Sequence, residues 1–495
     1  MRLYIGIDLG STNVKAGAYD GHFRCVASVS EAVSYDRKNG VEIELSGFWE
    51  LFTSLMRRLT QTKAVKEGQI AGIGFTGQAE TLVVLDKEGK PLMNAISWMD
   101  ERSKNECGEL EALLPPDECK RVTGQKAVLA TWPATKILWL KRNHKELFEN
   151  AAYYMLLKDY LVYRLTGRML ADCSIATFSF YFDIYNKCYW DKMLDILEIT
   201  KDQLPPLAEP CTKVGTLTEE ASELTGLPQD AVVNLGTLDH FAGMIGMGNT
   251  EPGIISLSTG TVMALAALAS GAEAGRRSGI AMHYGFIPDT YVMLPVAESG
   301  GISLEWFKNT CMTQMDYDTL NRELEGREGL GEIVFLPYLV GTNAPEFDTN
   351  TKGIFYGLRS EHDAVDMAKA VMEGVAFVLR KNCDAIREAG IPIRFIYATG
   401  GAARSKVWCQ LQADITGLPI VVLQEKEAAC LGAAIAAAVA MGDCESYQKA
   451  AEMARIEGGR YEPKKSERLE VNYRKFCALY QFMTEMEDGL AAADY

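Results

Sequence analysis

The chain has 495 residues, a formal net charge of -16 and twelve cysteines. Its length predicts two or more domains, each large enough for its own core. Its 48% hydrophobic and 23% charged residues are typical of a globular protein. The negative charge argues against non-specific binding to nucleic acid or to anionic membranes, because a phosphate backbone would be repelled.

The cysteines form no Cys-x-x-Cys pair and no regular spacing. This pattern indicates free thiols in a reducing cytoplasm, and neither a disulfide framework nor a zinc site. The first residues lead directly into a strand pattern, so we expect no signal peptide. The longest apolar tract, 428–441, is shorter than the roughly 20 residues that a membrane span needs, and it predicts a buried helix in a cytoplasmic protein.

The first predicted element is a hairpin over residues 3–19. An apolar run ends at the carboxylate of Asp8, passes a small polar turn and resumes at Val14, which indicates strand, turn and strand. Glycine and short polar donors suit a phosphate chain, and Asp8 would then face a divalent cation beside it. The turn residues are Gly10, Ser11, Thr12 and Asn13. Ordinary hairpin chemistry explains the same residues, so both interpretations stay open here.

A helix is predicted over residues 48–59, and a G-x-G-x-x-G pattern follows within residues 70–77. The dinucleotide fingerprint requires a helix to open at such glycines. Here a second strand pattern follows at 82–86 instead. We therefore predict a strand that delivers Gln78 and Glu80 to a cleft, where an amide and a carboxylate can bind hydroxyl groups.

Trp98, Asp100 and Arg102 alternate along the chain, so they would share one face of an extended segment. An indole, a carboxylate and a guanidinium on one face suit a polyhydroxylated ligand. These residues alone favour a second interpretation, in which the tryptophan is a core residue and the charges form an ion pair on the surface. Helices are predicted next at 136–140 and 153–165, the second ended by Gly167.

Residues 231–246 predict a strand, a glycine turn, the pair Asp239 and His240, and a helix of small residues. A carboxylate between a strand and a helix is well placed to face a cleft. An N-cap explains the same aspartate, and the residues alone favour capping.

A second hairpin over residues 253–265 repeats the form of the first, with an apolar run, a Ser/Thr/Gly turn and another apolar run. Two such hairpins nearly half a chain apart predict a duplicated pair of domains that holds one nucleotide. Residues 396–408 then predict a strand, the pair Gly400 and Gly401, and a helix. Bare backbone there would let a base or ribose lie against the chain, with Arg404 close enough to stack; close helix packing is the competing explanation. Helices at 364–386 and 469–490 and a strand at 419–423 complete the prediction.

Taken together, these segments resemble the FGGY family of carbohydrate kinases, within the actin-like ATPase superfamily. The resemblance covers nearly the whole chain. It rests on Gly6-Ile7-Asp8-Leu9-Gly10-Ser11-Thr12, Gly77-Gln78, Trp98-x-Asp100-x-Arg102, Lys158-Asp159-Tyr160 with Leu165-Thr166-Gly167, Asp239, Leu257-Ser258-Thr259-Gly260-Thr261, and Gly400-Gly401-Ala402 with Ser405 and Trp408.

The resemblance implies an α/β fold of two ribonuclease-H-like domains around a central cleft. Residues 1–246 would be the N-terminal domain, with the sugar and the first phosphate loop, and residues 247–495 the C-terminal domain, with ATP and the second loop. The implied cofactors are ATP and Mg²⁺. The implied partner is a small sugar or polyol, with a homodimer as the expected assembly and neither nucleic acid nor membrane as a partner.

By the same resemblance, Asp239 matches the general base that takes the proton from the sugar hydroxyl. Asp8 matches the carboxylate near Mg²⁺, with Asp239 beside it. The implied ATP-binding residues are Ser11, Thr12, Asn13, Gly260, Thr261, Gly301, Gly400, Gly401 and Arg404. The expected sugar-binding residues are Gln78, Glu80, Trp98, Asp100, Arg102 and His240.

The departures from the family pattern fall where the substrate is chosen. The family's xylulokinases usually follow Gly-Gln with Met-His-Gly and its glycerol kinases use Gln-Arg-Glu-Thr, whereas this chain has Gln78-Ala79-Glu80-Thr81. A missing arginine leaves more room, which favours a ketose such as a pentulose over glycerol. The alternatives are a glycerol- or erythritol-type polyol kinase and, in a different class, an actin-like ATPase or sugar sensor without kinase activity.

Overall fold

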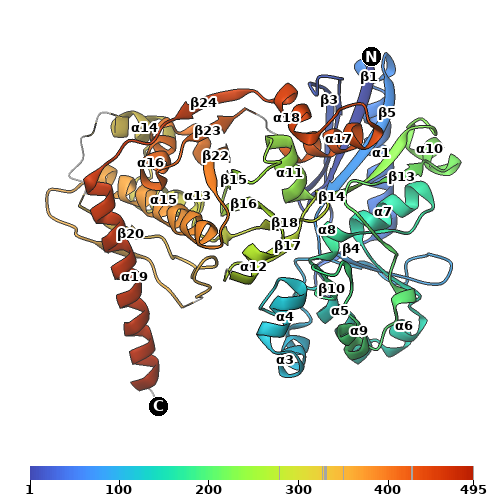
Figure 1. The fold of residues 1–495 in the computed structure, drawn as a ribbon, viewed down its shortest axis with the longest axis horizontal. Helices are drawn as coiled ribbons and strands as arrows, with labels where there is room; N and C mark the ends of the chain where they lie inside the picture. The colour runs from blue at the N-terminus through green and yellow to red at the C-terminus, as the bar shows by residue number, and fades with distance from the viewer. Residues whose placement is uncertain (278, 326, 328–331, 349, 425–426, 494–495) are drawn as a thin grey trace.

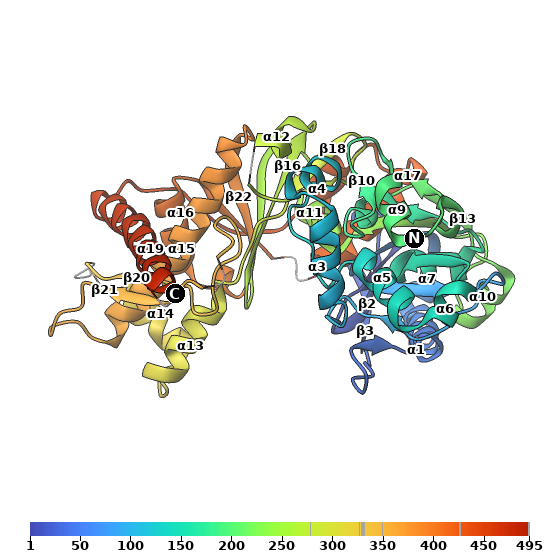
Figure 2. The same cartoon turned by 90° about the horizontal axis from the view of Figure 1, so that it is seen from below.

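The computed structural model describes residues 1–277, 279–325, 327, 332–348, 350–424 and 427–493. The chain forms two halves, each built around one central sheet with helices beside it, and the long helix α19 (Glu467–Ala493) extends away from the C-terminal half (Figure 1). Seen from below, the two halves lie side by side and meet along a narrow region (Figure 2).

The N-terminal half has a six-stranded sheet of order β13-β14-β5-β1-β2-β3. Strands β1, β5 and β14 run parallel, and β2, β3 and β13 pair antiparallel to their neighbours. The bounds are β1 (Arg2–Leu9), β2 (Asn13–Tyr19), β3 (Cys25–Ala32), β5 (Gln69–Gly77), β13 (Lys213–Thr216) and β14 (Val232–Leu238).

The C-terminal half repeats this pairing in the order β18-β16-β15-β22-β23-β24, with β17 added at one edge and β19 paired to β16. Strands β15, β22 and β23 run parallel and the others pair antiparallel. The bounds are β15 (Gly253–Thr259), β16 (Met263–Ser270), β17 (Met282–Tyr284), β18 (Thr290–Met293), β19 (Val296–Ala297), β22 (Ile393–Gly400), β23 (Ile420–Leu423) and β24 (Glu457–Tyr461). The two hairpins and the duplicated α/β architecture are confirmed, and this is the actin-like pair of ribonuclease-H-like domains.

Smaller elements surround the two sheets. A second sheet in the N-terminal half has the order β4-β7-β6-β8, and short pairs join β9 to β12, β10 to β11 and β20 to β21. Their bounds are β4 (Glu42–Ile43), β6 (Leu82–Leu85), β7 (Ala95–Ile96), β8 (Tyr153–Leu156), β9 (Ala171–Asp172), β10 (Phe182–Asp183), β11 (Cys188–Tyr189), β12 (Leu207–Ala208), β20 (Val334–Leu336) and β21 (Ile354–Tyr356).

The helices follow the apolar periodicity and the capping residues of the sequence. Glu44, for example, accepts hydrogen bonds from the backbone of Ser46 and Gly47 and so begins the amphipathic α1. The bounds are α1 (Leu45–Thr60), α2 (Lys63–Lys66), α3 (Lys104–Leu113), α4 (Pro116–Thr123), α5 (Pro133–Asn143), α6 (Lys145–Asn150), α7 (Leu157–Thr166), α8 (Cys173–Ala176), α9 (Asp191–Leu197), α10 (Glu219–Thr225) and α11 (Asp239–Met247) in the N-terminal half, and α12 (Glu273–Arg277), α13 (Gly301–Cys311), α14 (Tyr317–Glu325), α15 (Ala364–Glu388), α16 (Lys406–Thr416), α17 (Ala428–Met441) and α18 (Tyr447–Ala454) before α19. Two 3-10 turns cover Lys201–Gln203 and Ala402–Arg404.

Three predictions about local structure are wrong. The helix predicted at 153–165 begins only at Leu157, because residues 153–156 pair with β6 as β8. Residues 98–102 form a turned segment and not an extended one. The turn expected at Gly236 is a bulge inside β14, where the register against β5 shifts and Gly236 takes a φ of +79°.

The structure also bears on the cysteines, on membrane spans and on the G-x-G-x-x-G pattern. No disulfide bond joins any two of the twelve cysteines. Among the residues that the structure describes, no helix combines the length and the apolar character needed to cross a membrane. No helix opens at the glycines of the G-x-G-x-x-G pattern, because they belong to strand β5.

Helix α17 joins the two halves through contacts between backbones. It follows β23 of the C-terminal sheet, yet it packs between the N-terminal sheet and α11. A Cβ atom on Gly6 of β1 would lie 1.8 Å from the Cys430 carbonyl oxygen, and one on Gly432 would lie 1.8 Å from the Ala242 carbonyl oxygen. No side chain other than hydrogen fits at these two positions, so glycine sets the closeness of the packing.

We expect Gly432→Ala to destabilise the protein, because the added methyl group must push α11 and α17 apart. Overpacking of this kind costs about 1–3 kcal/mol. Gly108→Ala is the matched control, since Gly108 lies in α3 with nothing within 4 Å of an added Cβ, and alanine there should be neutral or stabilising. Thermal unfolding of the two variants measures the difference, and equal midpoints would contradict the close-packing argument.

Candidate active site

Asp8 and Asp239 face one cavity between the two halves. Its volume is about 810 Å³, and residues from both halves line it. The N-terminal half contributes Asp8, Asp239, His240, Gly243 and Met247, and the C-terminal half contributes Ser258, Thr399, Gly400, Gly401, Ala403, Arg404, Val422, Leu423, Gln424, Ala428 and Ala429. Two carboxylates and a glycine-rich loop therefore meet in one space.

Asp239 is the first residue of α11 and does not act as its N-cap. The N-cap position belongs to Leu238, which makes no side-chain capping bond. The Asp239 carboxylate accepts the backbone N–H of His240, at 2.6 Å. The N-terminus of α11 stabilises a negative charge at this position. The carboxylate is half-exposed at the cavity and can accept further hydrogen bonds from a ligand.

Asp8, the last residue but one of β1, faces the same cavity. Its Oδ1 atom is buried and has no hydrogen-bond partner among the described residues. Burial, together with the negative charge of Asp239, raises the pKa of the Asp8 carboxyl to about 7. A buried carboxylate oxygen without a hydrogen-bond partner, next to the negative charge of Asp239, destabilises the folded protein. A bound cation would neutralise this charge.

The residues present fit a divalent cation that is shared with phosphate. Mg²⁺ is commonly held by one or two carboxylates, with water and phosphate oxygens completing its shell. Within the described part of the chain no group of three or more His, Cys, Asp or Glu side chains forms a closed metal site. Asp8 and Asp239 would supply two carboxylate ligands, and water and phosphate oxygens would complete the shell of the cation.

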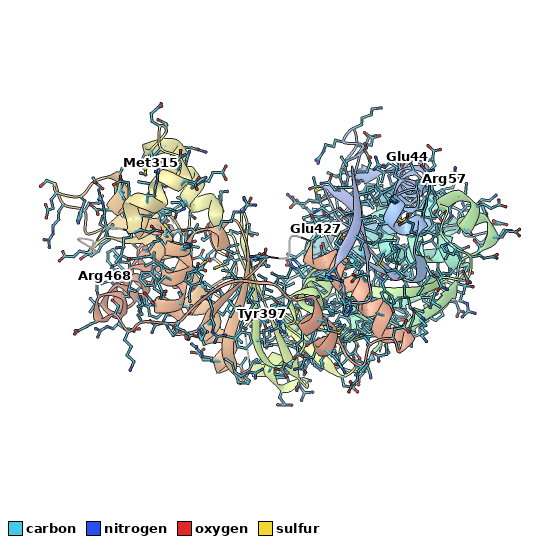
Figure 3. The ribbon with its side chains drawn as sticks, turned by 90° about the horizontal axis from the view of Figure 1, so that it is seen from above. Glu44, Arg57, Met315, Tyr397, Glu427 and Arg468 are labelled. Atoms are coloured by element: carbon cyan, nitrogen blue, oxygen red, sulfur yellow. The ribbon has the colours of Figure 1, made fainter. Side chains whose placement is uncertain are left out.

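An ion pair between the halves lies next to this cavity. Lys15 Nζ of β2 lies 2.7 Å from Glu427 Oε2, at the start of α17. Figure 3 shows Glu427 on the side of the N-terminal half that faces the C-terminal half. The Lys15 charge lowers the pKa of Asp8 and the Glu427 charge raises it, although burial and Asp239 outweigh Lys15.

A second cavity, of about 370 Å³, adjoins the first and shares Gly401 and Arg404 with it. Its lining brings together five of the residues predicted to bind ATP, namely Gly260, Thr261, Gly301, Gly401 and Arg404, while Gly400 lines only the first cavity. Leu304, Met372 and Trp408 add an apolar wall that suits a flat base. The two cavities together offer room for a base at one end and phosphates at the other.

Four polar residues of the second cavity were not predicted from the sequence. Asn321 Oδ1 accepts a hydrogen bond from the motif residue Ser405 at 2.5 Å, and Glu305, Tyr317 and Asp318 complete the polar lining. These four residues belong to α13 and α14, where the sequence shows only an amphipathic pattern. Nothing in that pattern marks them as a site.

The first hairpin turn lies beside Asp8 and is tied to the predicted sugar-binding segment. Thr12 is exposed, and Ser11 and Asn13 are half-buried. The indole N–H of Trp98 donates to Ser11 Oγ at 2.8 Å, and the Tyr35 hydroxyl donates to the Ser11 carbonyl oxygen at 2.6 Å. Trp98 itself is 37% exposed, so its ring remains available to a ligand.

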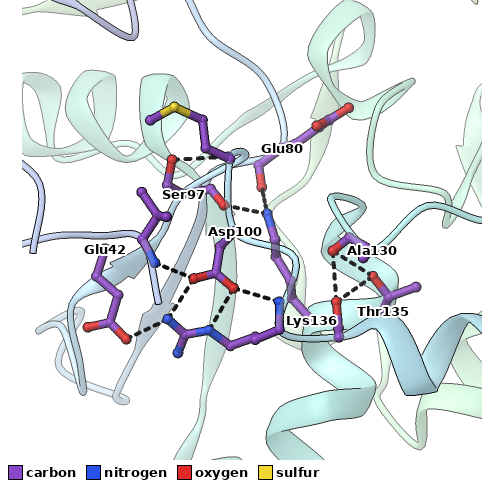
Figure 4. Close-up of polar contacts among 11 residues, drawn as sticks. Glu42, Glu80, Ser97, Asp100, Ala130, Thr135 and Lys136 are labelled. Atoms are coloured by element: carbon purple, nitrogen blue, oxygen red, sulfur yellow. Dashed lines mark hydrogen bonds and ion pairs between the residues drawn. The ribbon is translucent and has the colours of Figure 1, made fainter. Parts of the chain in front are cut away.

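Asp100 and Arg102 bind each other inside the protein. Arg102 donates from Nε and Nη2 to the two carboxylate oxygens of Asp100, both at 2.8 Å, and also contacts Glu42 Oε1 at 2.8 Å (Figure 4). The backbone N–H of Val41 donates to Asp100 as well. Asp100 is buried whereas Trp98 is exposed, so the two do not share a face as the extended interpretation required. The ion pair of the alternative interpretation is present, but that interpretation is wrong in two respects: the pair is buried and does not lie on the surface, and Trp98 is not a core residue.

Glu80 lies close to Asp239 and is held by a buried lysine that the sequence analysis did not single out. Lys136 Nζ donates to the backbone carbonyl oxygens of Glu80, at 2.9 Å, and Ser97, at 2.8 Å (Figure 4). Glu80 takes a φ of +64°, an uncommon conformation for glutamate. Burial raises the pKa of Glu80, with a smaller contribution from the Asp239 charge, and burial lowers the pKa of Lys136. In the sequence, the only sign of this role is that Lys136 begins an otherwise apolar helical segment, 136–140.

Gln78 and His240 are the remaining residues expected to bind the sugar. Gln78 is buried and its Oε1 accepts the Thr81 hydroxyl at 2.8 Å. His240 is exposed at the first cavity. Near it, the ring of His283 stacks on Phe178 with centroids 4.4 Å apart, and burial followed by the His240 charge lowers the pKa of His283 to about 3, so His283 stays neutral.

Two family models match the chain. The model of the N-terminal domain of the FGGY family of carbohydrate kinases matches residues 3–246, and the model of the C-terminal domain matches residues 255–441. The chain belongs to the FGGY family of carbohydrate kinases. It is therefore an enzyme that transfers a phosphoryl group to an alcohol, with ATP as the other substrate that the family implies. This assignment favours catalysis over the ATPase and sensor alternatives.

Individual relatives resemble this carbohydrate kinase over most of their length. A xylulose kinase from Staphylococcus epidermidis is 30% identical over 441 residues, which cover 88% of each chain. The crystal structure of xylulose kinase from Rhodospirillum rubrum has a TM-score of 0.90 at 26% identity, with 98% of this chain and 99% of that chain covered. The crystal structure of gluconate kinase from Lactobacillus acidophilus has a TM-score of 0.87, also at 26% identity, with coverage of 99% and 98%.

We expect Lys136→Met to raise the KM for the sugar acceptor about tenfold, equivalent to ~1.4 kcal/mol, and to leave the KM for ATP nearly unchanged. The substitution leaves two buried carbonyl groups unpaired and frees the strained backbone of Glu80. Steady-state assays of ADP release measure both constants. Lys141→Met is the control, because Lys141 lies on the same helix and pairs with the exposed Glu198. A parallel rise in both KM values would contradict a local role for Lys136.

Proposed function

We propose that this enzyme phosphorylates a hydroxyl group of a pentulose such as xylulose, with ATP and Mg²⁺. The observation that carries the proposal is that Asp8 and Asp239 face the same cavity as the glycine loop at Gly400 and Gly401. The names of the relatives support a xylulose-type acceptor, and the names of the solved structures leave a sugar acid as a second candidate.

Asp239 is the proposed general base. Its carboxylate accepts the backbone N–H of His240 and lies at the cavity between the halves. A hydroxyl group placed there would donate its hydrogen bond to Asp239. Asp239 would orient the oxygen and take its proton as the oxygen bonds to the γ-phosphorus of ATP and the bond from that phosphorus to the departing ADP breaks. Phosphoryl transfer depends mainly on positioning and on neutralisation of charge, so one aspartate is sufficient on the acceptor side.

Asp8 and Asp239 are the proposed carboxylates near Mg²⁺. The cation would neutralise charge on the phosphate oxygens and help to align ATP with the acceptor. The turn residues Ser11, Thr12 and Asn13 would offer donors to the phosphates from one half, and Gly260 and Thr261 from the other. Gly301, Gly400, Gly401 and Arg404 would hold the nucleoside and its nearest phosphate. The ring of Trp408 closes the apolar end of that cavity.

Gln78, Glu80, Trp98 and His240 are the proposed acceptor contacts. Asp100 and Arg102 would act indirectly, because their ion pair holds the turn that carries Trp98. The two acidic side chains at the cavity, Asp8 and Asp239, offer no positive charge to the carboxylate of a sugar acid, which favours a neutral ketose over gluconate.

The expected division of labour follows from these assignments. The domain of residues 1–246 would hold the sugar and the first phosphate loop, and the domain of residues 247–495 would hold ATP and the second loop. Twelve free thiols are consistent with the cytoplasmic location that we propose. The homodimer stays a prediction, which size-exclusion chromatography with light scattering would test.

A substrate panel tests the function directly. We expect ADP release with ATP and Mg²⁺ to be fastest with a pentulose, slower with hexuloses and polyols, and slowest with gluconate. Xylulose is compared with ribulose, fructose, glycerol, erythritol and gluconate at equal concentrations. A preference for gluconate would overturn the argument from the two carboxylates, and a preference for glycerol or erythritol would favour the polyol alternative.

We expect Asp239→Asn to lower kcat by roughly 10²- to 10⁴-fold while ATP affinity stays nearly intact, because only the proton acceptor is lost. The panel member that the wild-type enzyme phosphorylates fastest serves as acceptor. Titration with ATP checks that the nucleotide still binds. Unchanged turnover in this variant would remove Asp239 from the role of base.

A further inference from the structure

A buried network of side chains underlies the strand that leads to Asp239. It consists of Lys158 on α7, Asp172 before α8, Ser174 on α8 and Thr237 on β14, and we call it the β14 network. All four side chains are fully buried. None of them lines either of the two cavities described above.

The network begins at a bulge in β14. At Gly236 a Cβ atom would lie 1.7 Å from the Phe75 carbonyl oxygen, and the ladder to β5 is interrupted between Asn234 and Thr237. The carbonyl oxygen of Leu235 accepts a hydrogen bond from Lys158 Nζ at 2.6 Å. Bulges beside active sites re-aim the side chains that follow them, and the residue directly after this strand is Asp239.

Lys158 is held in place by two carboxylates. Its Nζ lies 2.8 Å from Asp159 Oδ1 and 3.4 Å from Asp172 Oδ2. Burial alone would lower the pKa of Lys158, but the two aspartates outweigh burial and raise it. The ammonium group therefore keeps its charge and binds the bulge as a fixed cation.

Ser174 extends the network to the last two residues of β14. Its hydroxyl donates to Asp172 Oδ1 at 2.8 Å. Since a serine hydroxyl has one hydrogen, the short contact of 2.7 Å between Ser174 Oγ and Thr237 Oγ1 must be donated by Thr237. The backbone N–H of Leu238 also points to Ser174 Oγ, at 3.4 Å. Ser174 thus uses one donor and two acceptor sites.

We infer that the β14 network positions Asp239. It holds the chain at Leu235, Thr237 and Leu238, directly before Asp239. Burial of the charged Lys158 ammonium group costs free energy. A functional role of the strand end that it holds would account for this cost. This inference rests on the proposed role of Asp239 as base.

Hydroxyl variants test the inference without exposing a buried charge. We expect Thr237→Val to lower kcat by about 10- to 100-fold, because small misplacements of a reacting group have effects of that size, with the KM for ATP unchanged. Thr237→Ser keeps the hydroxyl group and should retain kcat within about twofold. Ser174→Ala should resemble Thr237→Val. The assay uses the panel member that the wild-type enzyme phosphorylates fastest.

Thr225→Val is the matched control. Thr225 is also fully buried, and its hydroxyl also makes two hydrogen bonds, to the Ala221 carbonyl and from the Leu227 N–H, but it lies on α10. We expect it to lower the thermal unfolding midpoint as Thr237→Val does and to leave kcat unchanged. Equal kcat values for Thr237→Val and Thr225→Val would overturn the inference.

A double variant separates positioning from a general structural defect. If Thr237 acts through Asp239, then Thr237→Val should have almost no further effect on kcat in the Asp239→Asn background. If the loss of kcat in the double variant equals the product of the losses in the two single variants, Thr237 acts independently of Asp239, and the inference is wrong. Full turnover of Asp239→Asn alone would instead refute the proposed base, so the two failures can be told apart.

Discussion

The contact of α17 with the N-terminal sheet and with α11 determines the geometry of the whole site. Glycines at Gly6, Gly74, Gly246 and Gly432 bring backbones together where any Cβ would clash. Because α17 follows the C-terminal sheet in sequence, this packing ties the two halves together at one place. The C-terminal end of β1 and the N-terminal ends of α11 and α17 meet there, so Asp8, Asp239 and the start of α17 share one cavity.

The same constraint explains why charge accumulates at the cavity. Two helices begin beside it, and the end of β1 brings Asp8 within the electrostatic influence of Asp239, which together with burial raises the pKa of Asp8 to about 7. The protein alone leaves Asp8 Oδ1 without a partner among the described residues. A bound cation would neutralise the carboxylates and would in turn bind the triphosphate. The acidic residues at this cavity therefore favour ligand binding at the expense of the stability of the free protein.

Away from the cavity, two buried lysines have comparable roles. Lys136 satisfies carbonyl groups beside Glu80, and Lys158 satisfies the carbonyl at the bulge before Asp239. Each binds backbone oxygens at a point where the chain departs from regular structure, a positive φ at Glu80 and a bulge at Gly236. In both places a cation replaces the hydrogen bonds that a regular strand would have made, and the irregularity leads directly to a proposed functional side chain.

Periodicity and turn composition in the sequence determined the two hairpins, the long helices and the duplicated domain pair, because local hydrophobic patterns and glycine turns are short-range properties. The motif residues Asp8, Asp239, Gly260 and Gly400 were also visible there. Only the tertiary structure decided that Asp100 and Arg102 pair internally, that residues 153–156 are a strand, and that Lys136 and Asn321 belong to the site. These features depend on contacts between residues far apart in the chain, and no pattern along a single segment encodes which distant partner a side chain will meet.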